Sequence, residues 1–218
     1  MSFFDINHIF ITVLNYPISY LEFFATVTGF VAVWLSARAN IWSWPIGLVN
    51  VTLFFFLVFQ VQLYPDMFLQ VFFFVTNLMG WWRWTHPREG EEDRKQELRV
   101  SWMSSRTLII FSLLTLFITV LSGFFASNLH EMFSKVFNKP SAFPFLDSFV
   151  MVTSIVATYL MVQKKVECWI AWLIADLVAT FLYFSKGIHF VGLEYFIFCI
   201  ITVFGFVRWR KEFNGYAT

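Results

Sequence analysis

Seven long apolar runs divide this chain, and they restrict the folds open to it more than any other feature. The runs cover roughly residues 20–37, 41–59, 66–84, 106–127, 146–163, 167–185 and 188–207. About 20 mostly apolar residues form a helix long enough to cross the hydrocarbon core of a bilayer. Helices satisfy their own backbone hydrogen bonds in lipid, whereas a membrane barrel would show short alternating strands. The runs therefore predict an all-α integral membrane protein with seven transmembrane helices.

Composition agrees with this fold class and excludes several functions. Of the 218 residues, 59% are hydrophobic, 22% are aromatic and only 13% are charged, whereas soluble domains carry about 25% charged residues. The net charge of +1 and the absence of a basic block argue against a nucleic-acid partner. Cys168 and Cys199 lie inside apolar runs and are interpreted as packing residues. No metal or cofactor site is expected, because all four His lie at or beyond the ends of the runs.

Lys and Arg residues indicate how the chain is oriented. Twelve of the fifteen fall on the side that holds the first, third and fifth connections and the C-terminus, and three fall on the other side. Positively charged residues concentrate in cytoplasmic loops. We therefore expect an external N-terminus and a cytoplasmic C-terminus. The first nineteen residues contain no Lys or Arg and are expected to form an interfacial segment, with an amphipathic helix that ends near Pro17.

An internal repeat appears when the sequence is shifted against itself by 125 residues. Sixteen of the 64 positions from 21 to 84 then match positions 146 to 209, without a gap. The matches include Trp44 with Trp169 and Gly80 with Gly205. The second copy starts four runs after the first, so both copies should cross the membrane in the same direction. The fold class is therefore two parallel three-helix repeats joined by a linking helix, an architecture that transporters use.

The repeat divides the chain into expected segments. They are an N-terminal interfacial segment (1–19), a first three-helix repeat (20–84), a charged cytoplasmic loop (85–105), a linking transmembrane helix (106–127), an external loop (128–145), a second three-helix repeat (146–209) and a cytoplasmic tail (210–218). The charged loop is interpreted as a solvated linker.

Polar residues inside the apolar runs need a functional or structural reason, because they are costly in a bilayer. Residues three, four or seven apart share a helix face. On this spacing the third, sixth and seventh runs carry polar or aromatic stripes, with these candidate ligand contacts: Gln70, Asn77, Trp169, Trp172, Asp176, Tyr183 and Tyr195. Such residues also tie helices together or anchor them at the interface. As ligand contacts they favour a flat ring with hydroxyl or amide groups, and a cationic ring would suit Asp176 and the indoles.

The stretch NIWSWPIGLVN at the start of the second run combines Trp44, Pro45 and Gly47. Trp44 is a further candidate for stacking on the ligand. Pro and Gly favour bending of a helix, so Pro45 and Gly47 are predicted to form a hinge. The residue that matches Pro45 in the second repeat is Ile170, so the hinge would serve the first repeat alone.

Three motifs resemble those of the PnuC family of bacterial vitamin transporters: ARANIWSWPIG, LYPDMFLQVFF and GWWRW. The segment KKVECWIAWLIADLVATFLYFSKG is similar to that family's second half, and the resemblance covers about residues 20–210. It implies a helix plan like that of SWEET sugar transporters. It also implies a site lined by Trp44, Asn50, Gln70, Asn77, Trp169, Trp172, Asp176 and Tyr195.

The same resemblance implies uptake of nicotinamide riboside, an NAD precursor, across the bacterial inner membrane. Transport would be facilitated diffusion with alternating access, and a cytoplasmic riboside kinase would trap the product by phosphorylation. A homo-oligomer, with a trimer as one form, is also implied. Thiamine or riboflavin remain alternative cargoes, because relatives carry them. An intramembrane enzyme is the alternative of another class, although no protease signature is present in the sequence.

Overall fold

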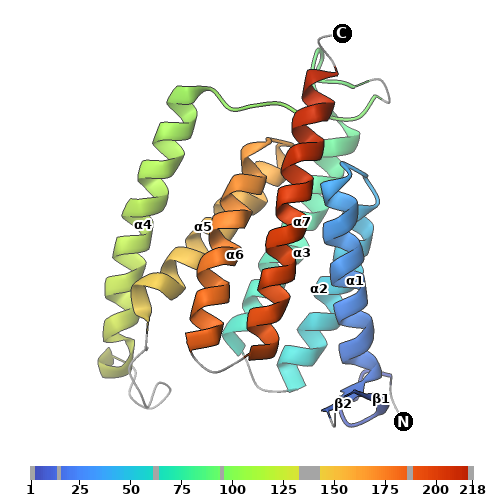
Figure 1. Cartoon of the computed structure of the whole chain (residues 1–218), viewed down its shortest axis with the longest axis vertical. Coiled ribbons are helices and arrows are strands. Elements are labelled where there is room, and N and C mark those ends of the chain that lie inside the picture. Colours follow the sequence, from blue (N-terminus) through green and yellow to red (C-terminus); the bar gives the residue numbers. More distant parts are fainter. Residues whose placement is uncertain are drawn as a thin grey trace. The chain divides into compact units, whose positions relative to one another are not determined.

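The computed structural model describes residues 3–13, 16–60, 64–93, 96–132, 143–185 and 189–215. The described residues form seven α-helices and one short hairpin (Figure 1). The strands are β1 (Ile9–Val13) and β2 (Tyr16–Ser19). The helices are α1 (Tyr20–Ala37), α2 (Ser43–Gln60), α3 (Tyr64–Thr85), α4 (Ser105–Met132), α5 (Pro144–Val162), α6 (Glu167–Ser185) and α7 (His189–Asn214).

Each predicted run is a helix, and α1 and α6 keep the predicted bounds of 20–37 and 167–185. Local signals fix the starts of α1 and α5. Ser19 Oγ accepts a hydrogen bond from the Glu22 N–H at 3.1 Å and caps α1, and Pro144 opens α5 without losing a helical donor. Within the described residues, four helices are long and apolar enough to cross a membrane: Tyr20–Ala37, Ser105–Asn128, Pro144–Val162 and Gly192–Asn214.

The chain folds as two compact units, Met1–Arg99 and Val100–Thr218. In the first unit α2 packs against both α1 and α3. In the second unit α6 packs against both α5 and α7, and α4 packs against α5. Figure 1 shows α1, α2 and α3 in blue to green, and α5, α6 and α7 in yellow to red. Each unit therefore holds one of the two three-helix repeats.

The turns between the first two helices of each repeat have the same geometry. Ala39 and Lys164 occupy equivalent positions and adopt left-handed backbone, with φ of 50° and 51°. Asn40 N–H donates to the Leu35 carbonyl at 3.0 Å, and Lys165 N–H donates to the equivalent Leu160 carbonyl at 2.9 Å. The 125-residue offset found in the sequence is therefore reproduced in the backbone of each unit.

The N-terminal helix prediction is wrong. Residues 9–13 and 16–19 pair as an antiparallel hairpin that leads into α1. The first strand reads IFITV, and its β-branched residues suit an extended backbone. Glu22 and the rest of α1 follow directly, so the chain enters its first long helix from a hairpin and not from an interfacial helix.

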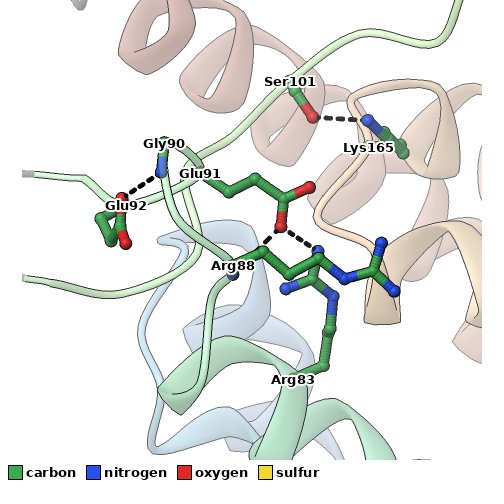
Figure 2. A network of polar contacts seen from close by, with 7 residues as sticks. All are labelled: Arg83, Arg88, Gly90, Glu91, Glu92, Ser101 and Lys165. Atoms are coloured by element: carbon green, nitrogen blue, oxygen red, sulfur yellow. Dashed lines mark hydrogen bonds and ion pairs between the residues drawn. The ribbon is translucent and has the colours of Figure 1, made fainter.

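The charged loop is also less solvated than predicted. In the first unit Leu98 is buried, and its N–H donates to the Trp84 carbonyl at 2.9 Å. In the second unit Val100 is buried, and Ser101 N–H donates to the Lys164 carbonyl at 3.1 Å. Figure 2 shows the side chains of this region, including Lys165 Nζ, which donates to Ser101 Oγ at 2.8 Å. The loop is thus attached by hydrogen bonds to each unit.

The ion pair between Arg83 and Glu91 makes part of this attachment sensitive to pH (Figure 2). Arg83 donates to Glu91 Oε2 at 2.5 Å, and this bond holds the pKa of Glu91 below its ordinary value. A lowered pKa in the folded state stabilises the protein above the unfolded-state pKa of about 4.3, and the stabilisation is lost as pH falls through the folded-state pKa. Glu91 is 38% exposed, so we expect at most about 1 kcal/mol.

Thermal unfolding of wild-type protein and of Glu91→Gln, followed between neutral and acidic pH, tests this contribution. The difference between their apparent Tm values should shrink as the pH is lowered. A difference that stays constant over the whole range would show that ionised Glu91 contributes nothing to stability.

Candidate functional site

Trp44 of α2 lies in a close contact with α3 of the first unit. Its ring covers Gly80, where any Cβ atom would overlap the indole. Its ring also meets Trp84 edge to face, with centroids 5.1 Å apart and an interplanar angle of 89°. Trp44 is only 5% exposed. Its position therefore joins α2 to α3, whatever further contact it makes with a ligand.

The second unit repeats this arrangement with Trp169 of α6. A Cβ atom at Gly205 of α7 would lie 2.7 Å from three atoms of the Trp169 ring system. Trp169 and Trp209 are edge to face, at 5.5 Å and 87°. We call the two arrangements, Trp44–Gly80–Trp84 and Trp169–Gly205–Trp209, the indole–glycine contacts. Their six residues are identities of the sequence repeat.

Indole N–H groups in both units have no acceptor among the described residues. They belong to Trp44, Trp169 and Trp172, and each nitrogen is buried. A buried donor without a partner costs about 1–3 kcal/mol. These groups are therefore available to donate to an acceptor other than the described residues, such as a ligand.

Two asparagine side chains of the first unit are held by backbone carbonyls. Asn50 Nδ2 donates to the Ala25 carbonyl of α1 at 2.7 Å. Asn77 Nδ2 donates to the Phe73 carbonyl of its own helix at 2.8 Å. The Asn77 amide lies against Gly47 of α2. The sequence candidates Gly47 and Asn77 are thus in direct contact.

Asp176 lies in the interior of α6 and is 3% exposed. Its carboxylate forms no ion pair and no hydrogen bond within the described part of the chain. A carboxylate at the centre of a membrane costs about 2.5–3.5 kcal/mol on insertion scales. Trp172 precedes it by four residues, so the two share a face of α6. The second unit therefore holds a buried carboxyl group and a free indole donor on one helix face.

The structure gives fewer contacts for the other residues that the sequence proposed as ligand contacts or as a hinge. Gln70 of α3 is half-buried, and its amide makes no hydrogen bond to a described residue. Tyr195 of α7 is half-buried and meets Phe198 edge to face at 6.2 Å. The side chain of Tyr183 lies outside the described residues. Pro45 lies in the first turn of α2, where a missing N–H removes no helical hydrogen bond, and its hinge role stays a prediction.

The glycines at these contacts were the residues that sequence reasoning undervalued. Gly80 and Gly205 are identical at equivalent positions of the repeat, and this identity is the sequence feature that could have indicated their importance. Gly29 of α1 has a weaker signal, because it lies three and seven positions after the polar residues Thr26 and Glu22 and so shares their helix face. A Cβ atom at Gly29 would lie 3.0 Å from Asn50 Nδ2. All three leave room for a large polar or aromatic side chain of the neighbouring helix.

A solved structure shares this fold. The crystal structure of the vitamin B3 transporter PnuC matches with a TM-score of 0.64 at 22% identity, over 88% of this chain and 81% of that chain. This match shows that the seven described helices are arranged in the fold of that structure.

The sequence of this chain is also similar to the sequences of known transporters. The nicotinamide riboside transporter PnuC of Escherichia coli is 32% identical over 96% of this chain and 94% of its own length. The Neisseria mucosa transporter of the same name is 26% identical over 89% of this chain and 73% of its own length. The riboflavin/roseoflavin transporter RibM of Streptomyces davaonensis is 26% identical over 84% of this chain and 81% of its own length.

The helices of the described residues, together with a transporter that is 32% identical over nearly the whole of both chains, identify this protein as a multi-pass membrane transporter and not an enzyme. A nicotinamide mononucleotide transporter family model matches residues 19–211, and the chain belongs to that family.

Proposed function

We propose that this protein takes up nicotinamide riboside across the inner membrane of a bacterium. The observation that carries the proposal is the 32% identity to the Escherichia coli nicotinamide riboside transporter over nearly the whole of both chains. Nicotinamide riboside combines a flat cationic ring with a carboxamide and ribose hydroxyls. The buried carboxylate of Asp176 suits the cationic ring, and the free indole donors of Trp169 and Trp172 suit its oxygen atoms.

The unphosphorylated riboside fits this chain better than the mononucleotide that gives the family model its description. A phosphate is usually bound by Arg, Lys or a helix N-terminus. The sequence places no Lys or Arg in the middle of any predicted span. The proposed cargo therefore carries hydroxyl groups and a ring charge but no phosphate.

Riboflavin is the second candidate cargo, because the riboflavin/roseoflavin transporter RibM is 26% identical over 84% of this chain. It also has a flat ring with polar edges and a chain of hydroxyls. It lacks the cationic ring, so it would leave the Asp176 carboxylate without a counter-charge. This difference favours nicotinamide riboside.

The proposed mechanism is facilitated diffusion with alternating access, in which the N-terminus is external and the C-terminus cytoplasmic. Twelve of fifteen Lys and Arg residues on one side support this orientation. Phosphorylation by a cytoplasmic riboside kinase would keep the free riboside concentration low and draw further uptake. We also propose a homo-oligomer, such as a trimer, and a hinge at Pro45 and Gly47.

Titration calorimetry of the purified protein with three ring vitamins tests the cargo. Nicotinamide riboside should bind at least about tenfold more tightly than riboflavin or thiamine, a difference of about 1.4 kcal/mol. The physical reason is the match between a compact cationic ring and Asp176. Tighter binding of riboflavin would assign the protein to the second cargo instead.

A further inference from the structure

Asn77 of α3 is fixed by two contacts inside the first unit. Its Nδ2 donates to the Phe73 carbonyl at 2.8 Å. Its Oδ1 lies against Gly47 of α2, so closely that a Cβ atom on residue 47 would overlap it. A backbone carbonyl only accepts hydrogen bonds, so the amide has a single orientation. The NH2 group is directed at its own helix, and the oxygen is on the other side of the amide.

Gly47 is not required by its own backbone. Among the described glycines only Gly90 has a positive φ, and Gly47 lies inside the regular helix α2. A glycine in a helix destabilises it relative to alanine. The benefit that offsets this loss is the space at residue 47, which the Asn77 amide fills.

The second unit has residues of different size at the two positions that are equivalent to Gly47 and Asn77. The repeat places Trp172 at the position of Gly47 and Thr202 at the position of Asn77. Thr202 is buried, and its hydroxyl donates to the Cys199 carbonyl at 2.8 Å. A glycine and an asparagine of the first repeat thus correspond to a tryptophan and a threonine of the second. The two units therefore differ in chemistry at equivalent places in the repeat.

We propose that Gly47 is a positioning residue that holds the Asn77 amide ready to accept a hydrogen bond from the transported ligand. The inference rests on the proposed function, because it takes Asn77 to contact the cargo. Asn77 Oδ1 accepts no hydrogen bond from a described residue, so it can receive one from a hydroxyl or a carboxamide N–H. Trp172 at the equivalent place supplies a free N–H donor. The ligand that Asn77 would bind therefore carries a hydrogen-bond donor.

A double-mutant cycle tests this role. Calorimetry would measure nicotinamide riboside binding to the wild-type protein, to Gly47→Ala, to Asn77→Ala and to the double variant. Each single variant should bind about tenfold more weakly, which corresponds to about 1.4 kcal/mol. Because Gly47 acts through Asn77, the double variant should bind no more weakly than Asn77→Ala alone.

Gly123→Ala is the matched control, since its new Cβ atom would overlap the Phe145 ring. It should lower the apparent Tm and leave the affinity unchanged. The inference is overturned if Gly47→Ala binds as the wild type does, or if the two single losses multiply in the double variant. Slower uptake by Gly47→Ala at unchanged affinity would leave Gly47 with the proposed hinge role alone, and the unchanged affinity would overturn the positioning role. A wild-type protein that binds none of nicotinamide riboside, riboflavin and thiamine contradicts the proposed function as well.

Discussion

Asp176→Asn is expected to weaken nicotinamide riboside binding by about tenfold to a hundredfold, because a contact with a charged group contributes about 1.5–3 kcal/mol. The side chain keeps its size and remains a hydrogen-bonding group, so the loss would come from the charge. The same variant should unfold at an equal or higher temperature. A carboxylate buried without an ion-pair partner among the described residues costs free energy that a carboxamide does not.

The combination of weaker binding and undiminished stability is what distinguishes a ligand contact from a structural one. Calorimetry and thermal unfolding of the same preparations measure both quantities. Asp147→Asn is the control, because Asp147 lies in the first turn of α5 and not in a helix interior. It should lose a little stability from the helix N-terminus and keep its affinity. If Asp176→Asn bound the riboside as tightly as the wild type, the carboxylate would not contact the cargo.

Gly205→Val is expected to lower stability by about 1–3 kcal/mol, the usual cost of adding volume to a packed contact. Even one extra carbon would lie 2.7 Å from the Trp169 ring system, and the edge-to-face pair with Trp209 would be displaced. For a chain of this length each kcal/mol corresponds to a fall of about 2–4 °C in Tm. Thermal unfolding in detergent would measure the change.

Val203→Phe is a suitable control on the same helix, since Val203 is exposed and a larger side chain there meets lipid. Its apparent Tm should stay near that of the wild type. Reducing the indole in Gly205→Val/Trp169→Phe should restore part of the loss, because the smaller ring leaves room for the new methyl groups. An unchanged Tm for Gly205→Val would mean that the indole–glycine contact does not hold α6 and α7 together.

The helices and the duplication could be predicted because both depend on patterns that are continuous along the chain. An apolar run of about 20 residues has few alternatives to a membrane helix. The repeat also identified particular residues, because Trp44 and Gly80 are identical to their counterparts Trp169 and Gly205. The equivalent turns at Ala39 and Lys164 then follow from two copies of one local structure.

The features that the sequence did not predict depend on contacts between distant residues or on very short segments. The strand Ile9–Val13 is five residues long, and a run of that length does not reveal its period. Leu98 is a single apolar residue in a charged loop, and its hydrogen bond to Trp84 spans fourteen positions. The contact between Gly47 and Asn77 depends on how α2 and α3 are oriented about their own axes. The spacing of residues within either helix does not specify that orientation.

Uptake into proteoliposomes tests the central claim of nicotinamide riboside transport most directly. Vesicles with purified protein should take up labelled riboside until the internal and external concentrations are equal, with or without a pH gradient. A riboside kinase and ATP enclosed in the vesicles should then draw label beyond that level. Vesicles that bind the riboside but take up no more of it than protein-free vesicles would contradict the account.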